Sequence, residues 1–89
     1  MEENKALQEE KQKVIVTIFN DDYTIKTENS EEYTKTIANK VDMKMHEIAS
    51  ANPALPQYKI AVLAALYISE ELYDSKIRYE ELLNIAEKL

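Results

Sequence analysis

The sequence has 89 residues, no glycine and no cysteine, and 17 acidic against 11 basic side chains give a net charge of −6. A single chain of this length has a marginal core, and without cysteine neither disulfides nor thiolate-bound metals can stabilise it, so oligomerisation is the expected remedy. The acidic balance disfavours nucleic acid and anionic membranes as partners, and the absence of glycine excludes glycine-rich phosphate loops.

Residues 1–12 are polar and of mixed charge, and we interpret them as a leader that is disordered or weakly helical. They lack the apolar core of a signal peptide. The longest charge-free run, residues 60–68, is far below the roughly 20 residues that span a bilayer. These features predict a cytoplasmic protein without membrane insertion.

Residues 13–27 predict a β-hairpin. The first strand is rich in β-branched residues and apolar on both faces, whereas the second is apolar on one face. The turn is expected at Asn20-Asp21-Asp22, because Asn and Asp tolerate the left-handed backbone that tight turns require. We expect the first strand to be covered on both faces or to continue the sheet into a partner.

Residues 29–52 predict an amphipathic helix, which Asn29 or Ser30 can cap and which Asn52-Pro53 ends. Its apolar row repeats every three or four residues and comprises Tyr33, Ile37, Val41, Met45 and Ile48.

A second helix is predicted from Pro56 or Gln57 to the end of the chain. Its apolar seam follows a heptad register: Ile68, Leu72, Ser75, Tyr79, Leu82, Ala86 and Leu89. A second stripe lies on a neighbouring face: Leu66, Tyr73 and Ile77. A single apolar seam is typical of a two-stranded coiled coil, whereas two adjoining stripes are typical of a bundle of more helices. The sequence is therefore compatible with a dimer or a tetramer, and with helices that run parallel or antiparallel.

The predicted fold class is therefore α+β: an N-terminal hairpin, one amphipathic helix, and a long C-terminal helix that forms a coiled coil with partner chains. The second helix would be roughly 50 Å long. It cannot lie wholly within a compact chain of this length, whose radius of gyration is about 12 Å. We therefore divide the chain into a head, residues 13–67, and an arm, residues 68–89. Residues 60–68 are expected to be buried against the hairpin, the first helix and a second copy.

Three segments in this order resemble the ZapA family of bacterial cell-division proteins: VIVTIFNDDYTI, TIANKVDMKMHEI and KIAVLAALYISEELYDSK. The resemblance covers residues 13–89 and is strongest at LAALYISEEL. It implies a ββαα head, dimerisation, tetramer assembly through the arms, and binding and bundling of FtsZ polymers at the mid-cell division ring. It implies neither catalysis nor a cofactor.

The resemblance places partner binding near the hairpin tip, where many members carry glycine at the position of Asn20. Proteobacterial members carry basic residues where this chain has Asp21 and Thr24. The candidate partner-binding residues are therefore Asn20, Asp21, Asp22 and Thr24, together with two lysines four residues apart on the first helix, Lys40 and Lys44. These lysines either meet an acidic partner or form a solvated helix face.

Catalysis is not predicted, because with one histidine and no cysteine we recognise no Ser/His/Asp or Cys/His set in the sequence. Only Asp42 is within helical reach of His46, which is too few ligands for a metal site. Paired acidic residues are typical here of structural positions rather than of catalytic carboxylates. They lie in the predicted turn (21–22), at the start of the first helix (31–32) and on solvated faces of the arm (70–71 and 80–81). Two alternatives stay open: a coiled-coil adaptor that binds a heterologous helix, and a small enzyme or ligand-binding protein with its site in a groove between heads.

Overall fold

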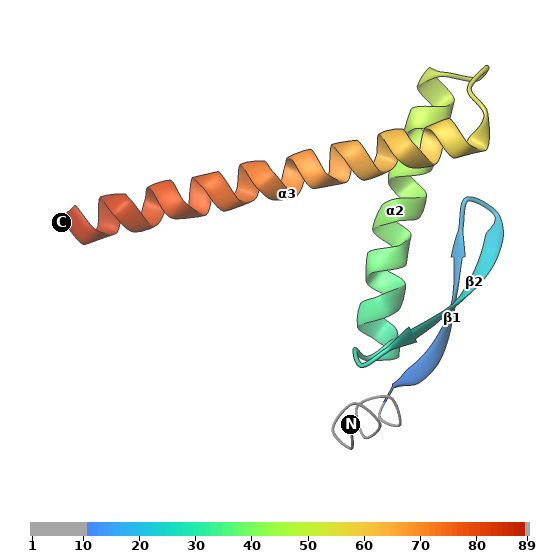
Figure 1. The fold of residues 1–89 in the computed structure, drawn as a ribbon, viewed down its shortest axis with the longest axis horizontal. Coiled ribbons are helices and arrows are strands. Elements are labelled where there is room, and N and C mark those ends of the chain that lie inside the picture. The colour runs from blue at the N-terminus through green and yellow to red at the C-terminus, as the bar shows by residue number, and fades with distance from the viewer. Residues whose placement is uncertain (1–10, 89) are drawn as a thin grey trace, which may run out of the picture. The chain divides into compact units, whose positions relative to one another are not determined.

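The computed structural model describes residues 11–88, which form two strands and two helices (Figure 1). In chain order these are β1 (Gln12–Ile18), β2 (Asp21–Thr27), α2 (Glu31–Ala51) and α3 (Gln57–Lys88). The predicted α+β class is confirmed. The chain divides into two compact units, Met1–Glu47 and Ile48–Leu89. The predicted leader falls mainly on residues 1–10, outside the described residues.

The two strands pair antiparallel in a register that leaves only Phe19 and Asn20 between the paired residues Ile18 and Asp21. Both turn residues have positive φ, 50° at Phe19 and 71° at Asn20, which is the signature of a type I′ turn. The prediction of a turn at Asn20-Asp21-Asp22 was therefore wrong in part: the turn begins one residue earlier, and Asp21 and Asp22 belong to β2. Phe19 was missed because a bulky side chain is uncommon in the left-handed region.

One face of the hairpin packs on α2 and forms the core of the first unit. The buried residues Val14, Val16 and Ala38 cluster, and the half-buried Ile18 packs against them. Figure 1 shows the twisted hairpin beside α2.

The other face of the hairpin, which we call the outer face, points away from α2 because side chains alternate along a strand. The register pairs its members directly across the strands: Lys13 with Lys26, Ile15 with Thr24, and Thr17 with Asp22. The Thr17 hydroxyl donates a hydrogen bond to Asp22 Oδ1 at 2.7 Å, which confirms that both lie on one face. Ile15 remains 64% exposed, so within residues 11–88 nothing covers this face.

The buried face of α2 differs from the predicted apolar row. Met45 and Ile48 are buried as expected, but Tyr33 and Ile37 are exposed. Thr34 and Ala38 take their place in the core, which rotates the buried face by about one residue. Thr34 tolerates burial because its hydroxyl donates to the Ser30 carbonyl at 3.0 Å.

The start of α2 has a side-chain cap. Ser30, one of the two predicted capping residues, accepts a hydrogen bond from the Tyr33 amide at its Oγ, 3.1 Å away. Glu31 and Glu32 occupy the first turn, where the positive end of the helix dipole favours carboxylates.

The second unit holds the end of α2, a short link and α3. The Asn52 amide and its side-chain Nδ2 both donate to the Ile48 carbonyl at 3.0 Å. The helix α2 ends at Ala51, because Asn52 precedes Pro53 and is disfavoured in the helical region. From Gln57 to Lys88 α3 runs without interruption (Figure 1). No helix among the described residues is apolar enough over a sufficient length to cross a membrane.

Within the predicted buried run 60–68, only Ile60 and Ala64 are buried in the single chain. Their spacing of four residues marks one narrow row of α3. Leu63 and Ile68 are half-buried, and the rest of the run, including Tyr67, is exposed. The expectation of burial all round is therefore not met by one copy of the chain.

Candidate functional site

The hairpin tip is tied to α2 by a hydrogen bond that crosses the first unit. The Phe19 amide donates to Asp42 Oδ1 at 2.8 Å. This bond satisfies a partly buried amide that the tight turn leaves without a strand partner. Phe19 also stacks on the ring of His46, with centroids 5.0 Å apart and the rings tilted by 56°.

His46 is positioned by the helix turn that precedes it. Its Nδ1 lies 2.9 Å from the Asp42 carbonyl oxygen, which can only accept, so Nδ1 carries the hydrogen and donates. The same nitrogen lies 3.4 Å from Asp42 Oδ1. Asp42 therefore connects the turn and the histidine. The residues described in the structure contain no group of three or more His, Cys, Asp or Glu side chains that could hold a metal ion.

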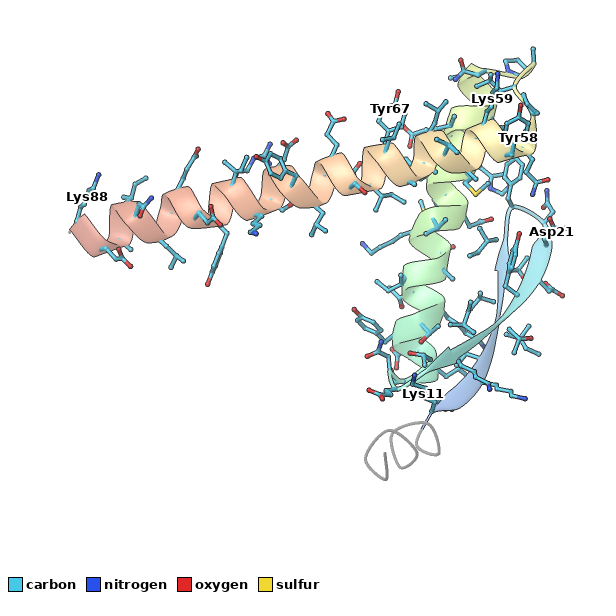
Figure 2. All side chains as sticks on the ribbon, viewed as in Figure 1. Lys11, Asp21, Tyr58, Lys59, Tyr67 and Lys88 are labelled. Atoms are coloured by element: carbon cyan, nitrogen blue, oxygen red, sulfur yellow. The ribbon has the colours of Figure 1, made fainter. Side chains whose placement is uncertain are left out.

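The candidate partner-binding residues of the hairpin are all exposed, but they point in different directions. Asn20 occupies the turn itself. Asp22 and Thr24 lie on the outer face, and Asp21 begins β2 beside the turn (Figure 2). Asp22 already accepts the Thr17 hydroxyl, so it offers a partner only part of its hydrogen-bonding capacity.

The two candidate lysines of α2 are not equivalent. Lys40 is exposed. Lys44 has a side chain only 21% exposed, and its Nζ lies 3.5 Å from Glu47 Oε2. Because α2 packs on the other face of the hairpin, the outer-face residues Asp22 and Thr24 do not share a surface with these lysines.

Most of the predicted oligomer residues on α3 present their side chains to solvent in the single chain. Leu66, Leu72, Tyr73, Tyr79 and Leu82 each keep at least 60% of their surface exposed. Ile68 and Ile77 are half-buried, Ser75 and Ala86 are exposed, and Leu89 lies outside the described residues. Figure 2 shows side chains standing off α3 on all sides between Tyr67 and Lys88.

Neither predicted stripe includes four further exposed apolar side chains of the same helix. They are Tyr58, Val62, Leu83 and Ile85. The signal was present, since these residues are apolar and lie on a predicted helix, but they fall outside a strict heptad seam. The exposed apolar surface of α3 is therefore broader than one coiled-coil seam.

One ion pair marks the start of α2. Lys35 Nζ lies 2.9 Å from Glu31 Oε1, and this hydrogen bond and charge lower the pKa of Glu31 from its usual 4.5. Both side chains are exposed, so the pair contributes little to stability.

These features define a small α+β protein whose hairpin is fixed on one helix and whose last helix presents apolar side chains along its length. The sequence model of the family described as "Cell division protein ZapA" matches residues 14–89. This chain belongs to that family.

Curated relatives of the same description are similar over most of their length. One from Halalkalibacterium halodurans is 38% identical over 79 residues, which are 86% of this chain and 87% of the relative. One from Geobacillus thermodenitrificans is 40% identical over 74 residues, which are 83% of this chain and 81% of the relative.

Two solved structures share the fold. A ZapA mutant dimer from Geobacillus stearothermophilus superposes with a TM-score of 0.67 and 39% identity, covering 81% of this chain and 84% of that one. A structure described as an unknown conserved bacterial protein from Pseudomonas aeruginosa gives a TM-score of 0.71 at 26% identity, covering 86% of each chain.

Proposed function

We propose that this protein binds polymers of FtsZ and bundles or aligns them at the division ring, without catalysing a reaction. Membership of a cell-division family across residues 14–89 carries this proposal. The role needs no cofactor. It places the protein in the cytoplasm, at mid-cell, because the polymers assemble there.

Self-association through α3 is the physical basis of bundling in this proposal. A row of leucine and tyrosine side chains, each at least 60% exposed, is unfavourable in water for an isolated helix. Packing the arm against the arms of other copies removes this surface from water. A mutant of a relative 39% identical to this chain is a dimer in its solved structure, which supports self-association of this chain.

Bundling then follows from multivalency. A dimer or tetramer carries two or four copies of the same weak binding surface. Once one copy holds a filament, the others experience a raised effective concentration of the neighbouring filament. The proposed contact region comprises Asn20 and Asp21 at the hairpin tip and Lys40 on α2, which are exposed and belong to the first unit. Lys40 supplies positive charge for an acidic partner surface.

The proposal is tested by sedimentation of FtsZ polymers formed with GTP, with and without this protein, together with light scattering. The protein is expected to pellet only when polymer is present, and scattering is expected to rise. If neither happens with folded protein and FtsZ from the same organism, the proposed function is wrong.

Two variants separate binding from bundling. Leu82→Asp, which disrupts the arm seam, is expected to bind filaments weakly and to leave scattering at the level of FtsZ alone. Lys40→Glu combined with Lys44→Glu is expected to lose pelleting while the protein keeps its oligomeric state. Unchanged pelleting of this double variant would remove the lysines from the contact region.

A further inference from the structure

The outer face of the hairpin holds two lysines that repel each other. Lys13 and Lys26 are directly opposite in the register. The two-residue turn makes Ile18 and Asp21 a hydrogen-bonded pair, and the alternation along the strands then makes Lys13 and Lys26 a non-hydrogen-bonded pair. Such pairs have the closest Cα atoms in an antiparallel sheet, about 4.5 Å apart, and like charges there are destabilising.

Nothing in the described part of the chain neutralises these charges. Within residues 11–88 neither lysine forms an ion pair or a hydrogen bond through its side chain. Glu28, the acid closest in sequence to Lys26, pairs with neither. Lys11, which precedes β1 at the same open end of the hairpin, adds a third positive charge nearby (Figure 2). This concentration of positive charge is notable in a chain whose net charge is −6.

An exposed apolar side chain adjoins the two ammonium groups. Ile15 lies two residues from Lys13 on the same face and is 64% exposed. Its cross-strand neighbour is Thr24, which is small and exposed. The combination of Lys13, Ile15 and Lys26, which we call the lysine patch, offers two cations beside one apolar contact.

We propose that the lysine patch binds an acidic peptide segment of a partner protein, with carboxylates on Lys13 and Lys26 and an apolar side chain against Ile15. Each bound carboxylate adds an attraction to the lysine beside it, which offsets the mutual repulsion of Lys13 and Lys26. α2 packs on the other face of the hairpin, and Lys13, Ile15 and Lys26 are exposed in the part of the chain that the structure describes. The proposal does not depend on which protein carries the segment, so failure of FtsZ pelleting leaves it standing.

The repulsion gives the proposal a distinctive test, because one substitution should stabilise the fold and weaken binding. Lys26→Glu places opposite charges across the strands, and the melting temperature is expected to rise by roughly 2–6 °C. Affinity for an acidic peptide is expected to fall about 5- to 30-fold, since one favourable charge contact becomes unfavourable. A residue with only a structural role would not move the two measurements in opposite directions.

The binding measurement is a nuclear magnetic resonance titration of the full chain with an acetylated five-residue peptide of alternating Glu and Leu. Wild-type shifts are expected at Lys13, Ile15, Thr24 and Lys26. The same peptide with Gln in place of Glu is expected to cause none. Lys59→Glu, an exposed charge reversal on α3 (Figure 2), is the matched control and should bind as the wild type does.

Three binding results would overturn the proposal: no shifts at the lysine patch, shifts of equal size with the Gln peptide, or equal peptide affinity in Lys26→Glu and wild type. Sedimentation of Lys26→Glu without peptide tests whether the lysine patch instead makes contacts between copies of this chain. A changed oligomeric state would assign the patch to contacts between copies and would also overturn the proposal, whereas an unchanged state together with weakened peptide binding supports it.

Discussion

Replacement of Leu82 by Asp tests whether the arm seam joins copies of this chain. In the single chain Leu82 keeps 65% of its surface exposed. Complete burial of a leucine side chain contributes about 1.5–3 kcal/mol, so covering the remaining surface contributes about 1–2 kcal/mol per copy. A symmetric dimer buries two such residues and therefore gains about 2–4 kcal/mol from this position alone.

The dissociation constant is expected to rise by roughly 30- to 700-fold from the lost burial, and desolvation of the new carboxylate adds to this loss. Sedimentation equilibrium over a concentration series measures the constant, and circular dichroism checks that the helices persist. Asn84→Asp is the matched control. It adds the same charge two residues further along α3, about 200° around the helix from the seam.

The control is expected to associate as the wild type does, while Leu82→Asp shifts toward the single chain at every concentration. Equal association of Leu82→Asp and wild type would refute the assigned heptad register. If the wild type itself is a monomer at all concentrations, α3 is left to pack on a helix of another protein, as in the coiled-coil adaptor alternative.

Three further predictions concern the first unit. Asp42→Ala is expected to lower the free energy of unfolding by about 1–3 kcal/mol, because the partly buried Phe19 amide loses its acceptor. Asp42→Asn retains an acceptor oxygen and should lose less stability in urea unfolding. Equal losses in the two variants would show that the hydrogen bond is not the cause. Asn20→Val is expected to destabilise the hairpin by about 1–2 kcal/mol at its φ of 71°, whereas Asn20→Gly should leave thermal stability unchanged or raised; a neutral valine would contradict the left-handed turn. Glu31→Gln removes a carboxylate whose pKa is lowered by Lys35. The wild type should therefore be slightly more stable than this variant above about pH 4.5, and the difference should disappear as the pH falls through the lowered pKa. A difference in melting temperature that persists at low pH would contradict this.

Periodicity in the sequence was sufficient to predict the elements. Alternating β-branched residues predicted the hairpin, and the repeats of three and four residues predicted both helices, because these patterns are local and depend on side-chain direction alone. The break at Asn52-Pro53 and the cap at Ser30 followed from single residues. The apolar residues of α3 were visible as well, since no polar residue interrupts the heptad positions except Ser75.

Tertiary structure alone decided which residues meet. Tyr33 and Ile37 are more apolar than Thr34, yet Thr34 is buried, because the approach of β1 to Ala38 selects the buried side of α2. The two-residue turn at Phe19 and Asn20, in place of a three-residue turn at 20–22, changed the pairing of the strands. That change brings Lys13 opposite Lys26 and places the Phe19 amide on Asp42, 23 residues away in the chain. Such contacts depend on how the hairpin packs on α2. That packing is decided by all the side chains on the two contacting faces together, whereas a local sequence pattern describes only one element at a time.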